Sequence, residues 1–182
     1  MTENAQSVVE FWYSPQVKPL WFNATPEFDA QLRQRYEALY RRAAAMQLAT
    51  WEENSVGALA LVILLDQLPL NMYRGKTESF AGEAAARAIA QRAIEHGLDQ
   101  RLDDEQKLFL YMPYMHSESI ADQERAVSLY QEAEMYEHVK HARHHRDIVL
   151  RFGRFPHRNA ILGRASTEAE LAYLGSEEAF CG

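Results

Sequence analysis

Cysteine is nearly absent from the 182-residue sequence, which contains Cys181 and no other cysteine. One thiol cannot close an internal disulfide, and a chain without a Cys-x-x-Cys pair cannot build a zinc knuckle. Such sparing use of cysteine is typical of proteins in a reducing compartment, so we expect a cytoplasmic location. Cys181 precedes only the last residue and is a poor candidate for a catalytic nucleophile.

The common catalytic and cofactor signatures are missing as well. The sequence contains no Gly-x-Ser-x-Gly turn, no P-loop, no Gly-x-Gly-x-x-Gly turn and no His-Glu-x-x-His motif. The triplet from His116 to Glu118 matches the His-x-Glu of zinc deaminases, but the Pro-Cys-x-x-Cys that those enzymes also need is absent. We therefore predict neither a metal nor an organic cofactor.

Long apolar runs and a basic leader are also lacking. The longest uninterrupted apolar run covers residues 58–65, far short of the ~20 residues that cross a bilayer. The first fifteen residues hold no lysine or arginine, so we expect no signal peptide and no membrane partner. With 47% hydrophobic residues, the chain can bury a sizeable core. We predict one domain over residues 1–182, with flexible tails at 1–6 and 176–182.

Positive charge is scarce overall but concentrated in one segment. The net charge of −7 disfavours general nucleic-acid binding. Residues 140–164 carry seven Lys and Arg against one Asp, a charge of +6, so the rest of the chain carries −13. A locally basic site on an acidic protein fits a small anionic molecule or a peptide carboxylate. The sequence does not reveal the oligomeric state.

Helical signals run through the whole chain, and strict alternation of apolar and polar residues is absent. Thr25 followed by Pro26 begins a helix whose apolar face holds Phe28, Leu32, Tyr36, Leu39 and Tyr40. Other predicted helices cover residues 7–12, 55–68 (buried, and stopped by Pro69), 77–97, 103–113, 119–153 (broken near 135–137 and ended by Gly153) and 168–174 (with a Thr167–Glu170 capping box). This pattern predicts an all-α fold of antiparallel helix pairs. We also expect the aromatic residues Phe11, Trp12, Tyr13, Trp21, Phe22 and Trp51 to form core.

Asp66 and Gln67 end the most apolar helical stretch, where an acid is costly unless it is paired. Asp66 is interpreted either as half of a buried ion pair, for which Arg74 is a possible partner, or as the acid or base of a pocket. His116 and Glu118 lie in a proline-broken connection, and Gln123 follows in the next helix. These three either fasten the loop or form part of a site.

Histidines recur on the next helix, where His138, His141 and His145 share one face. Three helical turns spread them too far for one tetrahedral ion, so we favour a buried, hydrogen-bonded His145 and a solvated His138 and His144.

The arginine-rich segment RFGRFPHRNAILGR follows this helix. It carries Arg151, Arg154, Arg158 and Arg164, whose guanidinium forks suit carboxylate or phosphate. His157 lies among them and titrates near neutral pH when unperturbed. Two alternatives stand: these arginines bind an anionic ligand, or they neutralise Asp66, Glu118 and nearby carbonyls as a structural network.

Several strings together resemble the bacterial family catalogued as domain of unknown function 924, namely FWYSP, WFNATPEFD, LLDQLPLNMYRG, FLYMPYMHSES and RFGRFPHRNAILGR. The resemblance covers about residues 8–174. It implies an all-α fold similar to that of tetratricopeptide-repeat proteins, and no reaction. The residues that match the family's polar pattern are Asp66, Gln67, Arg74, His116, Glu118, His145, Arg151, Arg154, His157, Arg158, Asn159 and Arg164. Leu70 departs from it, because the family commonly has an arginine there.

Two functions are compatible with this pattern. In the first, the polar residues line a cavity that binds a small anion or a peptide carboxylate; the ligand-binding residues are then Asp66, Gln67, Arg74, Gln123, His145, Arg151, Arg154, Arg158, Asn159 and Arg164. In the second, the protein is a metal-independent enzyme. Glu118 or Asp66 would then act as general base, with His116 or His157 as its acid–base partner.

Overall fold

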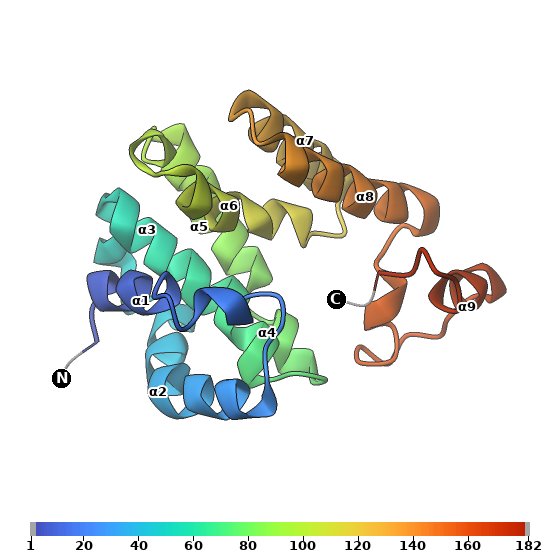
Figure 1. Ribbon diagram of the computed structural model, residues 1–182, viewed down its shortest axis with the longest axis horizontal. Coiled ribbons are helices and arrows are strands. Elements are labelled where there is room, and N and C mark those ends of the chain that lie inside the picture. Colours follow the sequence, from blue (N-terminus) through green and yellow to red (C-terminus); the bar gives the residue numbers. More distant parts are fainter. Residues whose placement is uncertain (1–2, 181–182) are drawn as a thin grey trace. The chain divides into compact units, whose positions relative to one another are not determined.

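The computed structural model describes residues 3–180, so Cys181 lies outside the described residues. No strand occurs between residues 3 and 180, which confirms the all-α prediction (Figure 1). The chain divides into two compact units. The first comprises the residues up to Arg74 together with Glu78–Pro113, and the second comprises Gly75–Thr77 with the residues from Tyr114 onward. The predicted single domain and its tails stay predictions, although Ala5 and Gln6 already lie in a helix.

The first unit is built from short helices and 3-10 turns. Its α-helices and its π-helical segment η3 are α1 (Ala5–Trp12), α2 (Pro26–Ala44), α3 (Ser55–Val62), η3 (Ile63–Gln67), α4 (Leu68–Met72), α5 (Glu83–Glu95) and α6 (Asp104–Met115), the last of which ends in the second unit. Short 3-10 turns lie at Lys18–Leu20, Ala49–Glu53, Thr77–Phe80 and Asp99–Arg101. Helix α3 packs against α1 and α5, while α2 packs against α4.

Local signals placed α2 correctly. Thr25 accepts a hydrogen bond from the Phe28 N–H, and Pro26 occupies the first turn, where a missing N–H costs nothing. All five predicted apolar residues of this helix are buried. The aromatic prediction was less accurate. Trp12 is fully buried, but Phe22 is 73% exposed and does not belong to the core.

The predicted stop at Pro69 was wrong. Helix α3 widens into the π-helical turn η3, in which the Leu68 N–H donates to the Ile63 carbonyl, and the chain then continues as α4 to Met72. Pro69 falls at the start of α4, where its absent N–H breaks no bond. The stretch Ser55–Met72 is long and apolar enough to span a membrane, but 89% of it is buried inside the protein, as expected for a core segment.

Proline also failed as a stop signal in α6. Pro113 lies inside this helix, which continues to Met115 instead of ending near residue 113. The predicted helix 77–97 likewise starts later, at Glu83 after a 3-10 turn, and Gly97 follows its end in the left-handed conformation.

The second unit contains α7 (Ile120–Glu132), α8 (Tyr136–Phe152), the 3-10 turn η6 (Pro156–Arg158) and α9 (Glu168–Leu174). Helices α7 and α8 pack side by side as an antiparallel pair (Figure 1). The break between α7 and α8, the end of α8 at a left-handed Gly153 and the capping box of Thr167 and Glu170 confirm the predictions. The core of this unit gathers around four buried residues: Ile148, Val149, Phe155 and Tyr173.

Candidate functional site

The first unit buries the predicted acid in its π-helical turn. Asp66 is 0% exposed, and the Gln67 side-chain amide donates to its carboxylate. The same amide nitrogen contacts the Met112 sulfur at 3.2 Å. Because a π turn inserts one residue into the helix, it redirects side chains relative to a regular α-helix, and such turns are frequent at functional sites.

A second buried acid, Glu83, approaches Asp66 through a close contact between backbones. Gly82 immediately precedes α5, and a Cβ atom there would lie 2.1 Å from the Leu65 carbonyl oxygen of η3. Only glycine permits this approach. The next residue on each segment is an acid, and carboxylate oxygens of Asp66 and Glu83 lie within 4.8 Å of each other.

The sequence-based selection of site residues missed Glu83, which is 9% exposed. The sequence offered only a weak indication of Glu83, namely a glycine followed by the first acid of an alanine-rich helix. Two carboxyl groups placed this close together form an arrangement that several acid–base enzymes use. The Asp66–Glu83 pair, as we name it, is therefore the part of the first unit best suited to proton transfer.

Arg74 does not bind Asp66, contrary to the partner suggested by the sequence. Its guanidinium donates to both carboxylate oxygens of Asp29, at 2.8 and 3.1 Å, and to the Asn71 side-chain oxygen at 2.8 Å. Asn71 in turn donates to the Gln67 carbonyl at 3.3 Å. Arg74 thus fastens the end of α4 to the first turn of α2.

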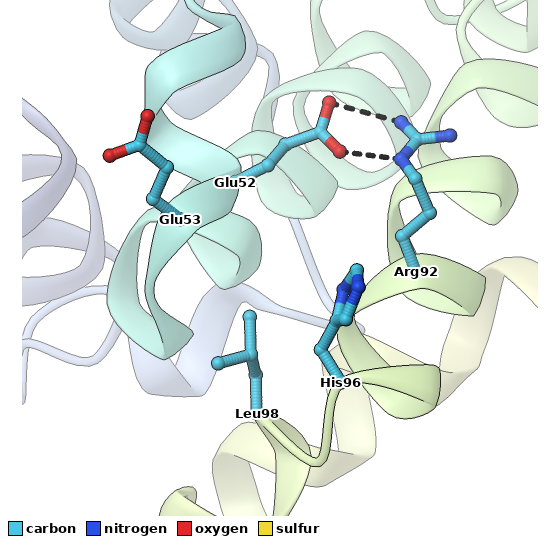
Figure 2. Close-up of a pocket in the computed structure, with 5 residues that line it drawn as sticks. All are labelled: Glu52, Glu53, Arg92, His96 and Leu98. Atoms are coloured by element: carbon cyan, nitrogen blue, oxygen red, sulfur yellow. Dashed lines mark hydrogen bonds and ion pairs between the residues drawn. The ribbon is translucent and has the colours of Figure 1, made fainter.

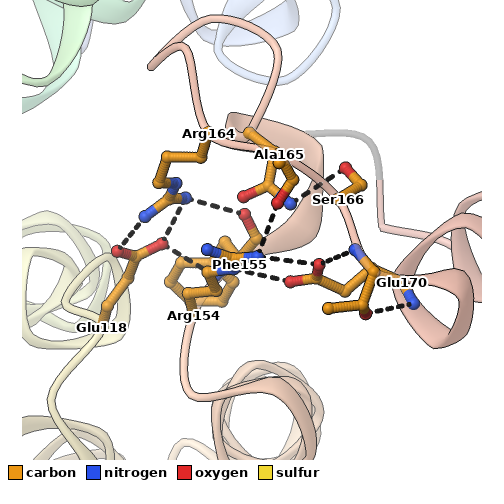
Figure 3. A network of polar contacts seen from close by, with 9 residues as sticks. Glu118, Arg154, Phe155, Arg164, Ala165, Ser166 and Glu170 are labelled. Atoms are coloured by element: carbon orange, nitrogen blue, oxygen red, sulfur yellow. Dashed lines mark hydrogen bonds and ion pairs between the residues drawn. The ribbon is translucent and has the colours of Figure 1, made fainter.

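In the second unit, Glu118 is bound on both carboxylate oxygens (Figure 3). Arg164 donates to them at 2.7 and 2.9 Å, and the Phe155 N–H donates at 2.8 Å. Arg164 also donates to the Phe155 carbonyl. Burial raises the pKa of Glu118, but the hydrogen bonds from Arg164 and Phe155 and the positive charge of Arg164 outweigh it, so the pKa is lowered. Glu118 is therefore a poor general base.

Arg154 forms a second pair of this kind with Glu170, which is 2% exposed. Two guanidinium nitrogens reach the carboxylate at 2.6 and 2.9 Å, and the Thr167 N–H adds a bond of 2.7 Å (Figure 3). Chiefly through the Arg154 hydrogen bonds, the pKa of Glu170 falls to about 2. Arg154 and Arg164 therefore bind protein carboxylates, which is the structural network that the sequence offered as one of two alternatives.

Phe155 connects the remaining predicted residues of this unit. Its buried ring lies 5.7 Å from the His145 ring, 5.6 Å from the His157 ring and 4.9 Å from the Arg158 guanidinium. Arg158 and Asn159 are buried, and the Asn159 amide donates to Ser166 Oγ.

His145 is buried and hydrogen-bonded to the His141 carbonyl, as predicted, and His144 is exposed. His138 was predicted to be solvated but is half-buried, because its ring lies 5.9 Å from that of Tyr130. Burial lowers the pKa of His145 to about 3. Burial and the charge of Arg158 lower the pKa of His157 to about 4. Both rings are therefore uncharged at neutral pH.

The other predicted residues of the second unit lie around this network. Gln123 is buried and donates to the Met115 and Ser117 carbonyls, so it fastens the connection between α6 and α7. His116 is half-buried beside this connection. Arg151 is exposed, with its guanidinium 4.7 Å from the Phe152 ring.

A separate surface pocket of about 240 Å³ lies in the first unit (Figure 2). Its lining includes the bidentate pair of Arg92 and Glu52, together with Glu53, His96 and Leu98. None of the sequence-predicted site residues lines this pocket.

Comparison with known proteins identifies the family of the chain. Residues 8–178 match the model of a family described as "Bacterial protein of unknown function (DUF924)". The chain belongs to this family. The solved structure of ATU0120, a protein of unknown function from Agrobacterium tumefaciens, is 40% identical to this chain. That structure superposes with a TM-score of 0.89 and covers 94% of this chain and 96% of its own.

No curated protein matches the chain. The DUF924 assignment confirms the resemblance given by the sequence strings, and every predicted site residue lies inside the matched range. The family description names no reaction, ligand or cofactor, so any proposal about them rests on the residues and their geometry.

Proposed function

We propose that this DUF924 protein is an acid–base enzyme for small molecules, with the Asp66–Glu83 pair as its proton-transfer centre. The approach of the two carboxylates within 4.8 Å in a buried setting carries the proposal. Where two carboxyl groups share one proton, one group can give a proton while the other receives one. The Gln67 amide, which donates to Asp66, would orient that carboxylate for the transfer.

The test compares the native protein with Asp66→Asn, Glu83→Gln and the surface control Glu52→Gln. Each is assayed against chromogenic esters, phosphate monoesters, glycosides and lactones. Removal of one member of the pair should lower the activity about 100-fold or more, because general acid–base groups contribute about that much, while the control keeps it. Activity that survives in both folded variants would refute the proposal, and no turnover in any class would favour the second candidate.

The second candidate is binding of a small anion or a peptide carboxylate by the basic segment. Four acids outside residues 140–164 pair with cations of this segment, which reduces its charge from +6 to +2: Glu137 with Lys140, Glu124 with Arg146, Glu170 with Arg154 and Glu118 with Arg164. That surplus favours anions. Mass spectrometry of natively purified protein should find a bound anion, and the anion should raise the Tm of the native protein but not of Arg158→Ala. A clean spectrum, with no Tm shift from any common anion, would count against this candidate.

The finer fold relationship is also a proposal. The antiparallel packing of α7 and α8 supports a tetratricopeptide-like arrangement of helix pairs. The sparing use of cysteine supports a cytoplasmic location. We therefore propose a cytoplasmic helical protein that binds or converts a small anionic molecule.

A further inference from the structure

The ring of Phe180 lies between two histidine rings of the second unit. Its centroid is 4.4 Å from that of His145 and 5.1 Å from that of His157, and both contacts are edge-to-face. The exposed His144 adds a more distant contact at 6.4 Å. An aromatic ring thus fills the space between two imidazoles that belong to the arginine-rich network around Phe155.

These imidazoles form a defined recognition surface. Nδ1 of His145 lies 2.8 Å from the His141 carbonyl oxygen, which can only accept, so Nδ1 carries the proton. In the neutral ring, Nε2 is then a hydrogen-bond acceptor. Neutral imidazole rings also pack against other aromatic rings without the cost of burying a charge. The pair therefore suits an aromatic ring that carries a hydrogen-bond donor.

Phe180 packs at the edge of the core cluster of the second unit, as a partly buried ring. It is half-buried, whereas Phe155 is 1% exposed, and it follows α9 without regular secondary structure. Its N–H donates to the Tyr173 hydroxyl at 2.9 Å, and the segment before it turns through a Ser176 hydroxyl bond to the Tyr173 carbonyl. Phe180 also lies beyond residue 178, where the family match ends, while His145 and His157 lie inside the match.

We propose that Phe180 is an internal occupant of an aromatic-binding slot between His145 and His157, and that the segment from Gly175 to Phe180 is a removable cover. The ligand of this slot is a planar aromatic ring bearing an O–H or N–H donor, such as a phenol or an indole. This donor binds Nε2 of His145. The slot does not include the Asp66–Glu83 pair, and it shares His145 with the anion site predicted from the sequence.

The first experiment uses phenol as the probe, with the native protein, Phe180→Ala and the matched control Phe22→Ala, which removes an exposed ring of the first unit. Histidine side-chain NMR signals are the readout. Loss of the Phe180 ring should shift the His145 and His157 signals in Phe180→Ala alone. Phenol added to Phe180→Ala should change these signals further and reach saturation at millimolar concentration. It should bind the native protein at least tenfold more weakly than Phe180→Ala. The proposal would be overturned if the histidine signals of Phe180→Ala are unshifted, or if this variant folds but does not bind phenol.

Two further measurements separate a ligand slot from an artificial cavity. Toluene has the same ring without a donor, and it should bind Phe180→Ala about tenfold more weakly than phenol, the effect of one hydrogen bond; equal binding would refute the assigned ligand class. In the native protein, excess phenol should weaken the nuclear Overhauser effect between the Phe180 and His145 rings. Its persistence would identify Phe180 as a packing residue, and Phe180→Leu repeats the test if the alanine variant does not fold.

Discussion

The two units differ in what surrounds their buried and half-buried acids. In the second unit, Glu118 and Glu170 are each bound by an arginine through two nitrogens. In the first unit, carboxylate oxygens of Asp66 and Glu83 lie within 4.8 Å of each other, and Arg74 binds Asp29. Arginines bind the two acids of the second unit, whereas the two acids of the first unit lie close to each other.

This difference separates acids that stabilise the fold from acids that could transfer protons. An arginine that binds a carboxylate fixes its ionised state, and the pKa of Glu170 accordingly falls to about 2 under the influence of Arg154. Such a group neither gives nor takes protons at neutral pH. The Asp66–Glu83 pair instead brings two acids together, the arrangement on which the proposed function rests. Proton transfer is therefore expected at the Asp66–Glu83 pair and stability at the arginine pairs.

The largest expected effect comes from separating the two acids of the first unit with Gly82→Ala. The added Cβ would lie 2.1 Å from the Leu65 carbonyl oxygen, so α5 must move away from η3. Overpacking against backbone at a buried position should lower the free energy of unfolding by about 3 kcal/mol. Urea unfolding measures this change.

Gly175→Ala is the matched control for this prediction. Its Cβ would meet the Leu171 carbonyl oxygen at 3.6 Å, an ordinary contact, and the backbone φ of −89° suits alanine. This variant should unfold within about 1 kcal/mol of the native protein. If both variants unfold at the same urea concentration, the close approach of Gly82 to Leu65 does not hold the Asp66–Glu83 pair together.

An intermediate effect is expected from Glu170→Gln, which removes the charge of a fixed acid. The folded pKa of about 2 lies below the ordinary 4.5, so the ion pair contributes full stability above about pH 4.5 and loses it as the pH falls toward 2. At pH 7 the variant should melt about 5 °C lower, and this deficit should shrink below pH 4. Thermal unfolding across this pH range measures both.

Glu168→Gln supplies the comparison within the same helical turn, because Glu168 is exposed in the first turn of α9. Its Tm should change by about 1 °C and show little pH dependence beyond that of the native protein. A Tm deficit of Glu170→Gln that stays constant down to pH 2 would show that its carboxylate is not the source of the acid sensitivity.

Local sequence signals predicted much of the fold. The Thr25 cap, the left-handed Gly153 and the capping box of Thr167 act within one helical turn, and each held in the structure. Proline was the exception. A proline stops a regular helix, but the π turn before Pro69 supplies a backbone geometry that tolerates it, and no local pattern announces that turn.

The sequence suggested candidate site residues by their type, but it did not predict which residues they contact. Asp66 was correctly singled out as an acid in an apolar stretch, yet its neighbour Glu83 arrives through the contact of Gly82 with a distant carbonyl. Arg154 and Arg164 were predicted to suit carboxylate or phosphate, and whether a ligand or a protein acid binds them depends on tertiary packing. Spacing along a chain reveals which groups share a helix face, not which helices meet.

The smallest expected effect concerns an ion pair on the surface, Arg92 with Glu52. It has the same bidentate geometry as the pairs of the second unit, with distances of 2.7 and 3.0 Å, but the Arg92 side chain is 46% exposed. Water and salt screen such a pair, so Arg92→Ala should lower the free energy of unfolding by only about 0.5 kcal/mol, and 1 M NaCl should abolish the difference. Urea unfolding at low and high salt measures it. A loss as large as that of Glu170→Gln, and insensitive to salt, would mean that bidentate geometry rather than burial decides what these arginine pairs contribute, and the contrast between surface and buried pairs would fail.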